Sequence, residues 1–159
     1  MILYTVAVKT SDEGGAGTNE DIYLRLFGHQ KEVGNWYDGD WFLDYDDIDE
    51  FETGHLNTFY CQSDLFIGEI EKILIYVRSH DDDSPAWKLD YITVSADIAG
   101  EKKTWRFPVY DWVGIPGKDP SRPDLKNYLT VGYNGVTDSH GNADFKLATE
   151  LPIKSVVRL

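Results

Sequence analysis

The feature that most constrains this chain is an alternation of apolar and polar side chains with a period of two. It recurs in residues 2–8, 22–27, 91–96 and 104–109. A period of two places successive side chains on opposite faces of a strand. In residues 69–78 strand and helix spacings compete, and three Ile, one Val and one Tyr favour a strand there. Short strands separated by turn-forming residues predict an all-β fold, an antiparallel β-sandwich of about eight strands.

Negative charge is concentrated in one part of the chain. The 159 residues have a formal net charge of −13, and residues 32–71 hold twelve of the 28 acids but none of the 15 Lys and Arg. Such a chain repels phosphate backbones and bare anionic bilayers, so we expect no nucleic-acid binding. The sequence lacks an apolar run of transmembrane length. Its first ten residues lack the pattern of a signal peptide, so we expect either the start of a mature protein or a chain that begins after a removed signal.

Two stretches have the composition of long loops. Residues 32–54 hold the densest acidic part, and residues 114–127 contain three prolines and two glycines. We therefore predict a sandwich over residues 1–113, followed by a linker and C-terminal extension over residues 114–159. Strand-like runs in that extension leave open that it adds strands to the same domain. The single cysteine, Cys61, lies in an apolar run and is expected to be a buried, inert thiol, which is compatible with a cytosolic chain.

Sequence patterns of enzymatic chemistry are absent. The chain has no G-x-S-x-G nucleophile motif, no H-E-x-x-H zinc motif and no phosphate-binding P-loop. We therefore expect a protein without catalytic activity. The many acids leave a glycosidase-type carboxylate pair open, but they make that hypothesis unspecific.

Oxygen ligands for a cation are better represented. Residues 14–21, 46–52 and 80–84 form three loops rich in Asp, Glu, Asn and Gly. Ca²⁺ takes six to eight oxygens from carboxylates, carbonyls and water, and in all-β proteins these come from several loops. The alternative is that the loops are solvated turns, because Asp, Asn and Gly are also common turn formers. The EF-hand pattern fails everywhere, so a helix–loop–helix calcium site is excluded.

Five short segments follow one another in a fixed order along residues 2–113. They are GTNEDIYL at 17–24, FETG at 51–54, LFIGEIEKI at 65–73, PAWKLDYI at 85–92 and WRFPVYDW at 105–112. In order and spacing they resemble the PLAT domain, also called LH2, of lipoxygenases, pancreatic-type lipases, bacterial alpha-toxin and polycystins. The resemblance implies an eight-stranded β-sandwich that serves as a targeting or interaction module and not as a catalyst.

The resemblance also implies a calcium site, because loops at one end of the sandwich hold Ca²⁺ in the calcium-binding members. Carried over by position, one or two Ca²⁺ ions would be held by Gly15, Gly17, Thr18, Asn19, Asp21, Asp49, Glu50, Glu52, Asp81 and Asp82. One position departs from the pattern. Many calcium-binding members have an acid directly before the tryptophan of P-x-W, where this chain has Ala86, so the acids at 81–83 would have to substitute.

Aromatic side chains beside the calcium loops enter the membrane in such members. The candidates here are Trp36, Tyr37, Trp41, Phe42 and Trp112. Trp41 also matches a core position of the family, so burial is the alternative for it. Trp87 and Trp105 lie in alternating runs and are predicted to be core residues.

Together these features predict a non-catalytic, calcium-binding module that associates peripherally with membrane lipids, and we expect a monomer. Bound Ca²⁺ would cancel the repulsion between the carboxylates and anionic lipid. One alternative is a protein-interaction module that binds no lipid. A second is a carbohydrate-binding module, which would require a row of exposed aromatic side chains.

Overall fold

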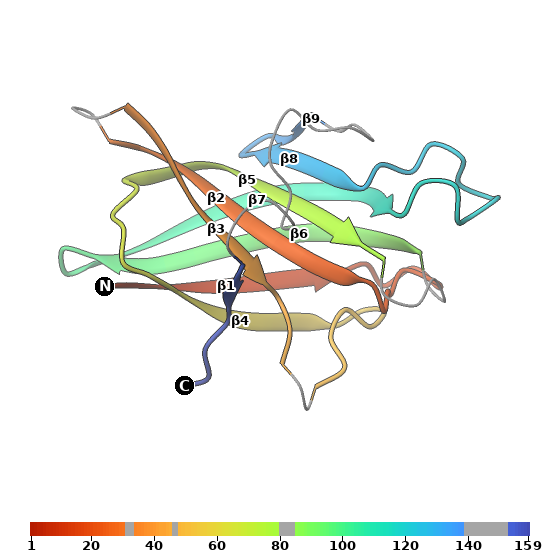
Figure 1. Ribbon diagram of the computed structural model, residues 1–159, viewed down its shortest axis with the longest axis horizontal. Helices are drawn as coiled ribbons and strands as arrows, with labels where there is room; N and C mark the ends of the chain where they lie inside the picture. Colours follow the sequence, from red (N-terminus) through yellow and green to blue (C-terminus); the bar gives the residue numbers. More distant parts are fainter. Residues whose placement is uncertain (31–33, 46–47, 80–84, 139–152) are drawn as a thin grey trace.

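In the part of the chain that the structure describes, ten strands form two sheets that pack face to face (Figure 1). The structure is a computed structural model that describes residues 1–30, 34–45, 48–79, 85–138 and 153–159. The strands are β1 (Ile2–Thr10), β2 (Asp21–Gln30), β3 (Gly34–Phe42), β4 (Leu56–Ser63), β5 (Glu69–Arg78), β6 (Ala86–Ile98), β7 (Glu101–Gly114), β8 (Tyr128–Gly132), β9 (Gly135–Asp138) and β10 (Lys154–Ser155). Among these residues no helix has the length and apolar character needed to cross a membrane.

The predicted all-β sandwich is confirmed, with ten strands instead of eight. One sheet has the order β4-β1-β6-β7 and the other the order β10-β3-β2-β5-β8-β9. Neighbouring strands are antiparallel except β10, which pairs with β3 in parallel. Residues after 113 contribute β8, β9 and β10 to the six-stranded sheet. Residues up to 114 therefore contribute seven strands, of which β3 lies in a segment that the sequence predicts as a loop, and the C-terminal part contributes three.

The alternating segments bury one face each between the sheets. Tyr4, Val6 and Val8 of β1 are fully buried, and Leu24 of β2 is buried opposite them. Cys61 of β4 lies in the same core, and burial raises the pKa of its thiol above the ordinary value. The expectation of a buried cysteine is confirmed, and a thiol in an apolar site resists ionisation.

The prediction of a loop over residues 32–54 is wrong for the first part of this stretch, because Gly34–Phe42 forms the strand β3. Two acids of this strand are buried and have distant partners. Arg25 donates two hydrogen bonds, of 2.7 and 2.9 Å, to the carboxylate of Asp40. Asp38 accepts hydrogen bonds from the Ser63 hydroxyl and the Lys154 ammonium group. Paired in this way, acids that are typical of a loop occupy the interior of a sheet.

A second aromatic cluster covers the other face of the six-stranded sheet. The ring of Tyr23 stacks on Phe42 of β3 and on Tyr76 of β5, with both centroid distances at 5.1 Å. Tyr128 of β8 belongs to the same cluster. Tyr23, Tyr76 and Tyr128 are buried, so this row offers no exposed platform for a sugar. This cluster therefore does not supply the exposed row that the carbohydrate-binding alternative requires.

The Arg25–Asp40 ion pair provides a test of this architecture. We expect Arg25→Met to lower the free energy of unfolding by about 3–5 kcal/mol, because it leaves the buried carboxylate of Asp40 charged and unpaired. Urea unfolding at neutral pH measures the change. The double variant Arg25→Met/Asp40→Leu should recover a large part of the loss, since apolar side chains can replace a buried ion pair at little cost. Equal losses in the single and double variants would contradict this account.

Candidate functional site

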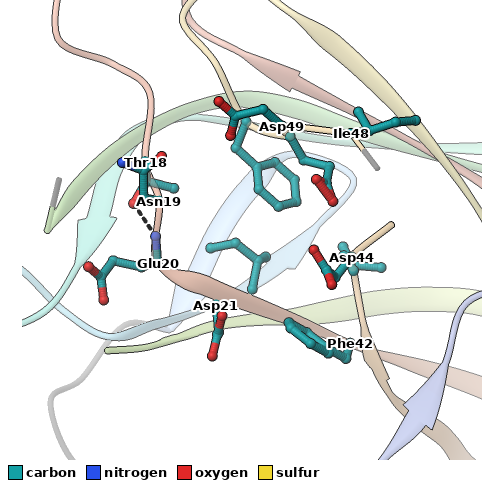
Figure 2. A pocket seen from close by; sticks show the side chains of 12 residues that line it. Thr18, Asn19, Glu20, Asp21, Phe42, Asp44, Ile48 and Asp49 are labelled. Carbon is teal, nitrogen blue, oxygen red and sulfur yellow. Dashed lines mark hydrogen bonds between the residues drawn. The ribbon is translucent and has the colours of Figure 1, made fainter. Parts of the chain in front are cut away.

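Acids from two loops line a cleft of about 520 Å³ at one end of the sandwich. The loop before β2 and the segment after β3 contribute Thr18, Asn19, Glu20, Asp21, Ile22, Phe42, Leu43, Asp44, Ile48, Asp49, Glu50 and Phe51. Figure 2 shows Asn19 and Asp21 on one side of this space and Asp44 and Asp49 on the other. Five of the twelve lining residues are acids, and none of these described residues is Lys or Arg. The cleft is therefore strongly negative.

Hydrogen bonds donated by backbone amides hold the two loops together. The amide of Gly17 donates to the Thr53 hydroxyl at 3.1 Å, and the amide of Thr18 donates to the Phe51 carbonyl at 3.0 Å. A Cβ atom at Gly17 would lie 2.9 Å from that same carbonyl, so only glycine fits this approach. The Thr18 hydroxyl accepts a bond from the amide of Glu20 at 3.1 Å, which fixes the turn into β2 (Figure 2).

Phe51 anchors the acidic loop to the core. Its ring lies 5.1 Å from the Trp87 ring and 5.6 Å from the Phe59 ring. Its amide donates to the Asn57 side chain at 2.9 Å, and its backbone has a φ of 62°. A left-handed conformation is uncommon for a phenylalanine and persists only where packing enforces it. The anchored residue sets the positions of Glu50 and Glu52 on either side of it.

At the cleft, the carboxyl group of Glu50 interacts with that of Asp44, and the carboxyl group of Glu52 interacts with that of Asp49. Burial, together with a hydrogen bond to Asp44 and the charge of Asp44, raises the pKa of Glu50 to about 7, although a bond from the Tyr45 amide opposes the shift. A hydrogen bond to Asp49, helped by burial, raises the pKa of Glu52. In each pair the glutamic acid retains its proton more strongly, because two adjacent negative charges repel. A divalent cation would replace these protons.

Within the part of the chain that the structure describes, no three His, Cys, Asp or Glu side chains converge closely enough to hold a metal ion by themselves. The cleft also offers the Asn19 amide and the Thr18 hydroxyl. Calcium accepts such neutral oxygens and backbone carbonyls beside its carboxylate ligands. The donor set fits a hard cation whose ligands come from both loops.

The structure brings together about half of the predicted ligands. Thr18, Asn19, Asp21, Asp49 and Glu50 line the cleft. Glu52 reaches it only through Asp49, and Gly15 and Gly17 shape the loop without lining the cleft. Asp81 and Asp82 lie outside the described residues.

Two acids of the cleft are missing from the sequence-based prediction. Glu20 is buried beside Asp21, and Asp44 lies two residues after the end of β3. The string W-F-L-D at 41–44 contains the signal for Asp44, since an acid two residues beyond a strand lies in the loop at its end.

The prediction that Trp41 is a membrane anchor is wrong. This residue is fully buried in the main core, so the alternative of a core position holds. Trp87 and Trp105 are buried as predicted. Phe42, the neighbour of Trp41, points to the other face of the sheet, is half-buried and lines the cleft.

The other anchor candidates differ in position. Tyr37 is exposed, but it lies five residues before Phe42 on β3, roughly 17 Å along the strand. Trp112 is half-buried, and the guanidinium carbon of Arg122 lies 3.6 Å from the centroid of its ring. The backbone of Trp36 pairs opposite Gly28, and its side chain is outside the described part of the structure.

The raised pKa of Glu50 predicts a pH dependence. The folded protein keeps a proton that the unfolded chain releases, so this contribution to stability is complete below pH 4.5 and is lost as the pH rises through about 7. Relative to Glu50→Gln, the wild type should lose about 2 kcal/mol of unfolding free energy over that range. Urea unfolding of both proteins measures the difference. Glu101→Gln, in the hairpin at the far end, is the control and should leave the profile unchanged.

Solved structures of lipoxygenases share this architecture. Coral 8R-lipoxygenase superposes on 82% of this chain with a TM-score of 0.61 at 22% identity, and the match covers 16% of the lipoxygenase chain. A calcium-dependent 11R-lipoxygenase superposes on 83% of this chain and 17% of its own, with a TM-score of 0.60 at 24% identity. At these identities the similarity establishes the fold.

Sequence comparison establishes the family. Lipoxygenase homology domain-containing protein 1 of Mus musculus is 30% identical over 157 residues, which cover 92% of this chain and 7% of the mouse protein. The chain thus spans less than a tenth of that relative. Residues 4–123 match the PLAT/LH2 domain. This protein therefore belongs to the PLAT/LH2 domain family, as the five sequence segments predict.

Proposed function

We propose that this chain is a non-catalytic PLAT/LH2 module that binds one or two Ca²⁺ ions and thereby associates peripherally with membrane lipids. The observation that carries the proposal is the acid-lined cleft in which carboxyl groups pair with each other. Such pairs lose their repulsion when a cation binds between them, and the free energy released stabilises the folded protein.

Calcium is the cation that this cleft suits best. Its ligands are carboxylate, amide and hydroxyl oxygens from two separate loops, an arrangement that the flexible coordination of Ca²⁺ tolerates better than Mg²⁺ does. Of the two lipoxygenases with the same fold, the coral enzyme is described as activated by calcium through a C2-like domain, and the 11R enzyme as calcium-dependent. Both descriptions support calcium as the ligand of this chain.

Apolar side chains at the cleft supply the membrane contact. Ile48 lines the cleft and is 47% exposed, and the half-buried Phe42 lies on the same cleft (Figure 2). Burying one such side chain in lipid contributes roughly 1–2 kcal/mol, which gives only reversible binding without a second attraction. Bound Ca²⁺ supplies that attraction, because it neutralises the carboxylates of the cleft and bridges them to anionic headgroups.

The alternative is a protein-interaction module that binds no lipid, and one surface favours it. Tyr110 of β7 is exposed and has a φ of 52°, and Arg106 donates to its hydroxyl at 2.9 Å. The guanidinium carbon of Arg106 lies 4.5 Å from the Tyr91 ring centroid. Tyr and Arg dominate binding energy at protein interfaces, and strained backbone is often functional. Stabilisation by Ca²⁺ without binding to vesicles would favour this alternative.

The calcium proposal predicts that one double variant raises the stability of the metal-free protein and lowers its affinity for Ca²⁺. Ca²⁺ at about 100 times its dissociation constant should raise the unfolding free energy of the wild type by about 2.7 kcal/mol. Asp44→Asn/Asp49→Asn should be more stable than the wild type without metal, because repulsion is relieved, and should lose at least about tenfold in affinity. Calorimetry and thermal unfolding measure both effects. Asp97→Asn, away from the cleft, is the matched control. A wild type that Ca²⁺ neither binds nor stabilises would refute the proposal.

The membrane proposal predicts a local effect of one apolar side chain. Ile48→Ser should reduce sedimentation with phosphatidylcholine/phosphatidylserine vesicles in Ca²⁺ by about tenfold, because one inserted side chain is lost. Chelator should abolish sedimentation of the wild type. Leu65→Ser is the control, since Leu65 is 44% exposed and lies in the β4–β5 connection at the other end of the sandwich. Equal losses from the two variants would contradict insertion at the cleft.

A further inference from the structure

The last described segment joins the two sheets. We name residues 153–158 the C-terminal clip. Lys154 and Ser155 pair in parallel with Trp41 and Phe42 of β3, and two residues later Val157 bridges to Tyr60 of β4. Figure 1 shows this dark-blue segment running from β3 towards β4. Because β3 and β4 belong to different sheets, the clip closes one side of the sandwich.

An ion pair fixes the first end of the clip. The ammonium group of Lys154 bonds to the carboxylate of Asp38 and lies 5.1 Å from the ring centroid of Trp41. Asp38 is only 3% exposed, and it also accepts a 2.8 Å bond from the amide of Gly39. A buried carboxylate without its cation is costly, so a seated clip is the stable arrangement.

Tyr45 connects the second end of the clip to the acidic cleft. Its hydroxyl donates to the Val157 carbonyl at 3.0 Å and accepts from the Tyr60 amide at 3.1 Å. Its ring stacks on Phe59, with centroids 5.4 Å apart. On the same residue, the backbone amide donates to Glu50 Oε1 at 2.7 Å. Tyr45 therefore binds the clip through its hydroxyl and a carboxylate of the cleft through its backbone amide.

The clip and the cleft also share walls. A second cavity of about 260 Å³ is lined by Phe42, Asp44 and Tyr45 together with Ser155, Val156 and Arg158 of the clip. Phe42 and Asp44 line the acidic cleft as well. The carboxyl pair of Asp44 and Glu50 thus lines the cleft and is bonded, through Glu50, to the residue that the clip holds.

We propose that Tyr45 is a positioning residue through which seating of the C-terminal clip and cation binding at the cleft stabilise each other. The inference rests on the proposed calcium function. With the clip seated, Tyr45 keeps its amide on Glu50 and fixes this carboxylate for a cation. By linkage, a cation that favours the fixed carboxylate must favour the seated clip by the same factor.

The test compares two tyrosine hydroxyls. Tyr45→Phe keeps the ring and the amide but loses both bonds to the clip and β4. Tyr133→Phe is the matched control, because the Tyr133 hydroxyl also donates to a backbone carbonyl, that of Ile70, away from the cleft. Calorimetry should show Ca²⁺ affinity about fivefold or more lower in Tyr45→Phe and unchanged in Tyr133→Phe.

Hydrogen exchange provides a readout that a merely structural role would not change. In the wild type, Ca²⁺ should slow exchange of the Val157 amide, which donates to the Tyr60 carbonyl at 2.9 Å. In Tyr45→Phe this effect of Ca²⁺ should disappear. Exchange at Val94 in the centre of the four-stranded sheet should stay the same in both proteins. A calcium affinity and a Val157 response that are unaffected by Tyr45→Phe would overturn the inference and leave calcium binding intact.

A metal-free measurement separates the two proposals. If the wild type binds no Ca²⁺, the proposed function fails, and exchange of the amide at position 45 without metal decides whether the clip positions the cleft. The inference requires this exchange to be about tenfold faster in Tyr45→Phe than in the wild type and Tyr133→Phe. Equal rates in the three proteins would refute the connection between clip and cleft.

Discussion

Neutralisation of two buried carboxylates in one strand is the constraint on which the rest of the structure depends. Asp38 and Asp40 of β3 are both excluded from solvent. Their cations come from elsewhere in the chain, Arg25 fifteen residues earlier and Lys154 116 residues later. An unpaired charge at either position would cost several kcal/mol. The six-stranded sheet can therefore form completely only when β2 pairs with β3 and the C-terminal clip is seated.

This dependence explains which parts of the fold could be predicted from the sequence. The strands β1, β2, β6 and β7 follow from local alternation, because one of their faces is apolar throughout. The strand β3 could not be predicted in this way. Its sequence, GNWYDGDWF, has the composition of a turn, and the partners that make its acids tolerable are distant in sequence. Local patterns contain no information on such pairing.

The part of the candidate site that could be predicted is the part fixed by the order of its loops along the chain. The resemblance places the loop before β2 and the acids around Phe51 at one end of a sandwich, and the structure joins them in one cleft. The resemblance could not show which of Trp41 and Phe42 is buried in the main core. Neighbouring side chains of a strand lie on opposite faces, and only the register decides which face is inside. Trp41 pairs with Leu24 of the core and Phe42 with Tyr23 of the outer cluster. That register depends on contacts across the sheet.

The parallel pairing of β10 has a further consequence, for association between molecules. A strand at the edge of a sheet presents free amide and carbonyl groups that can pair with another chain. At Trp41 and Phe42 this edge of β3 is occupied by Lys154 and Ser155. The strand at the opposite edge of the same sheet, β9, is only four residues long. Lys154 and Ser155 thus cover the last two residues of the longer edge, and their release would leave that end of β3 open to pairing with another chain.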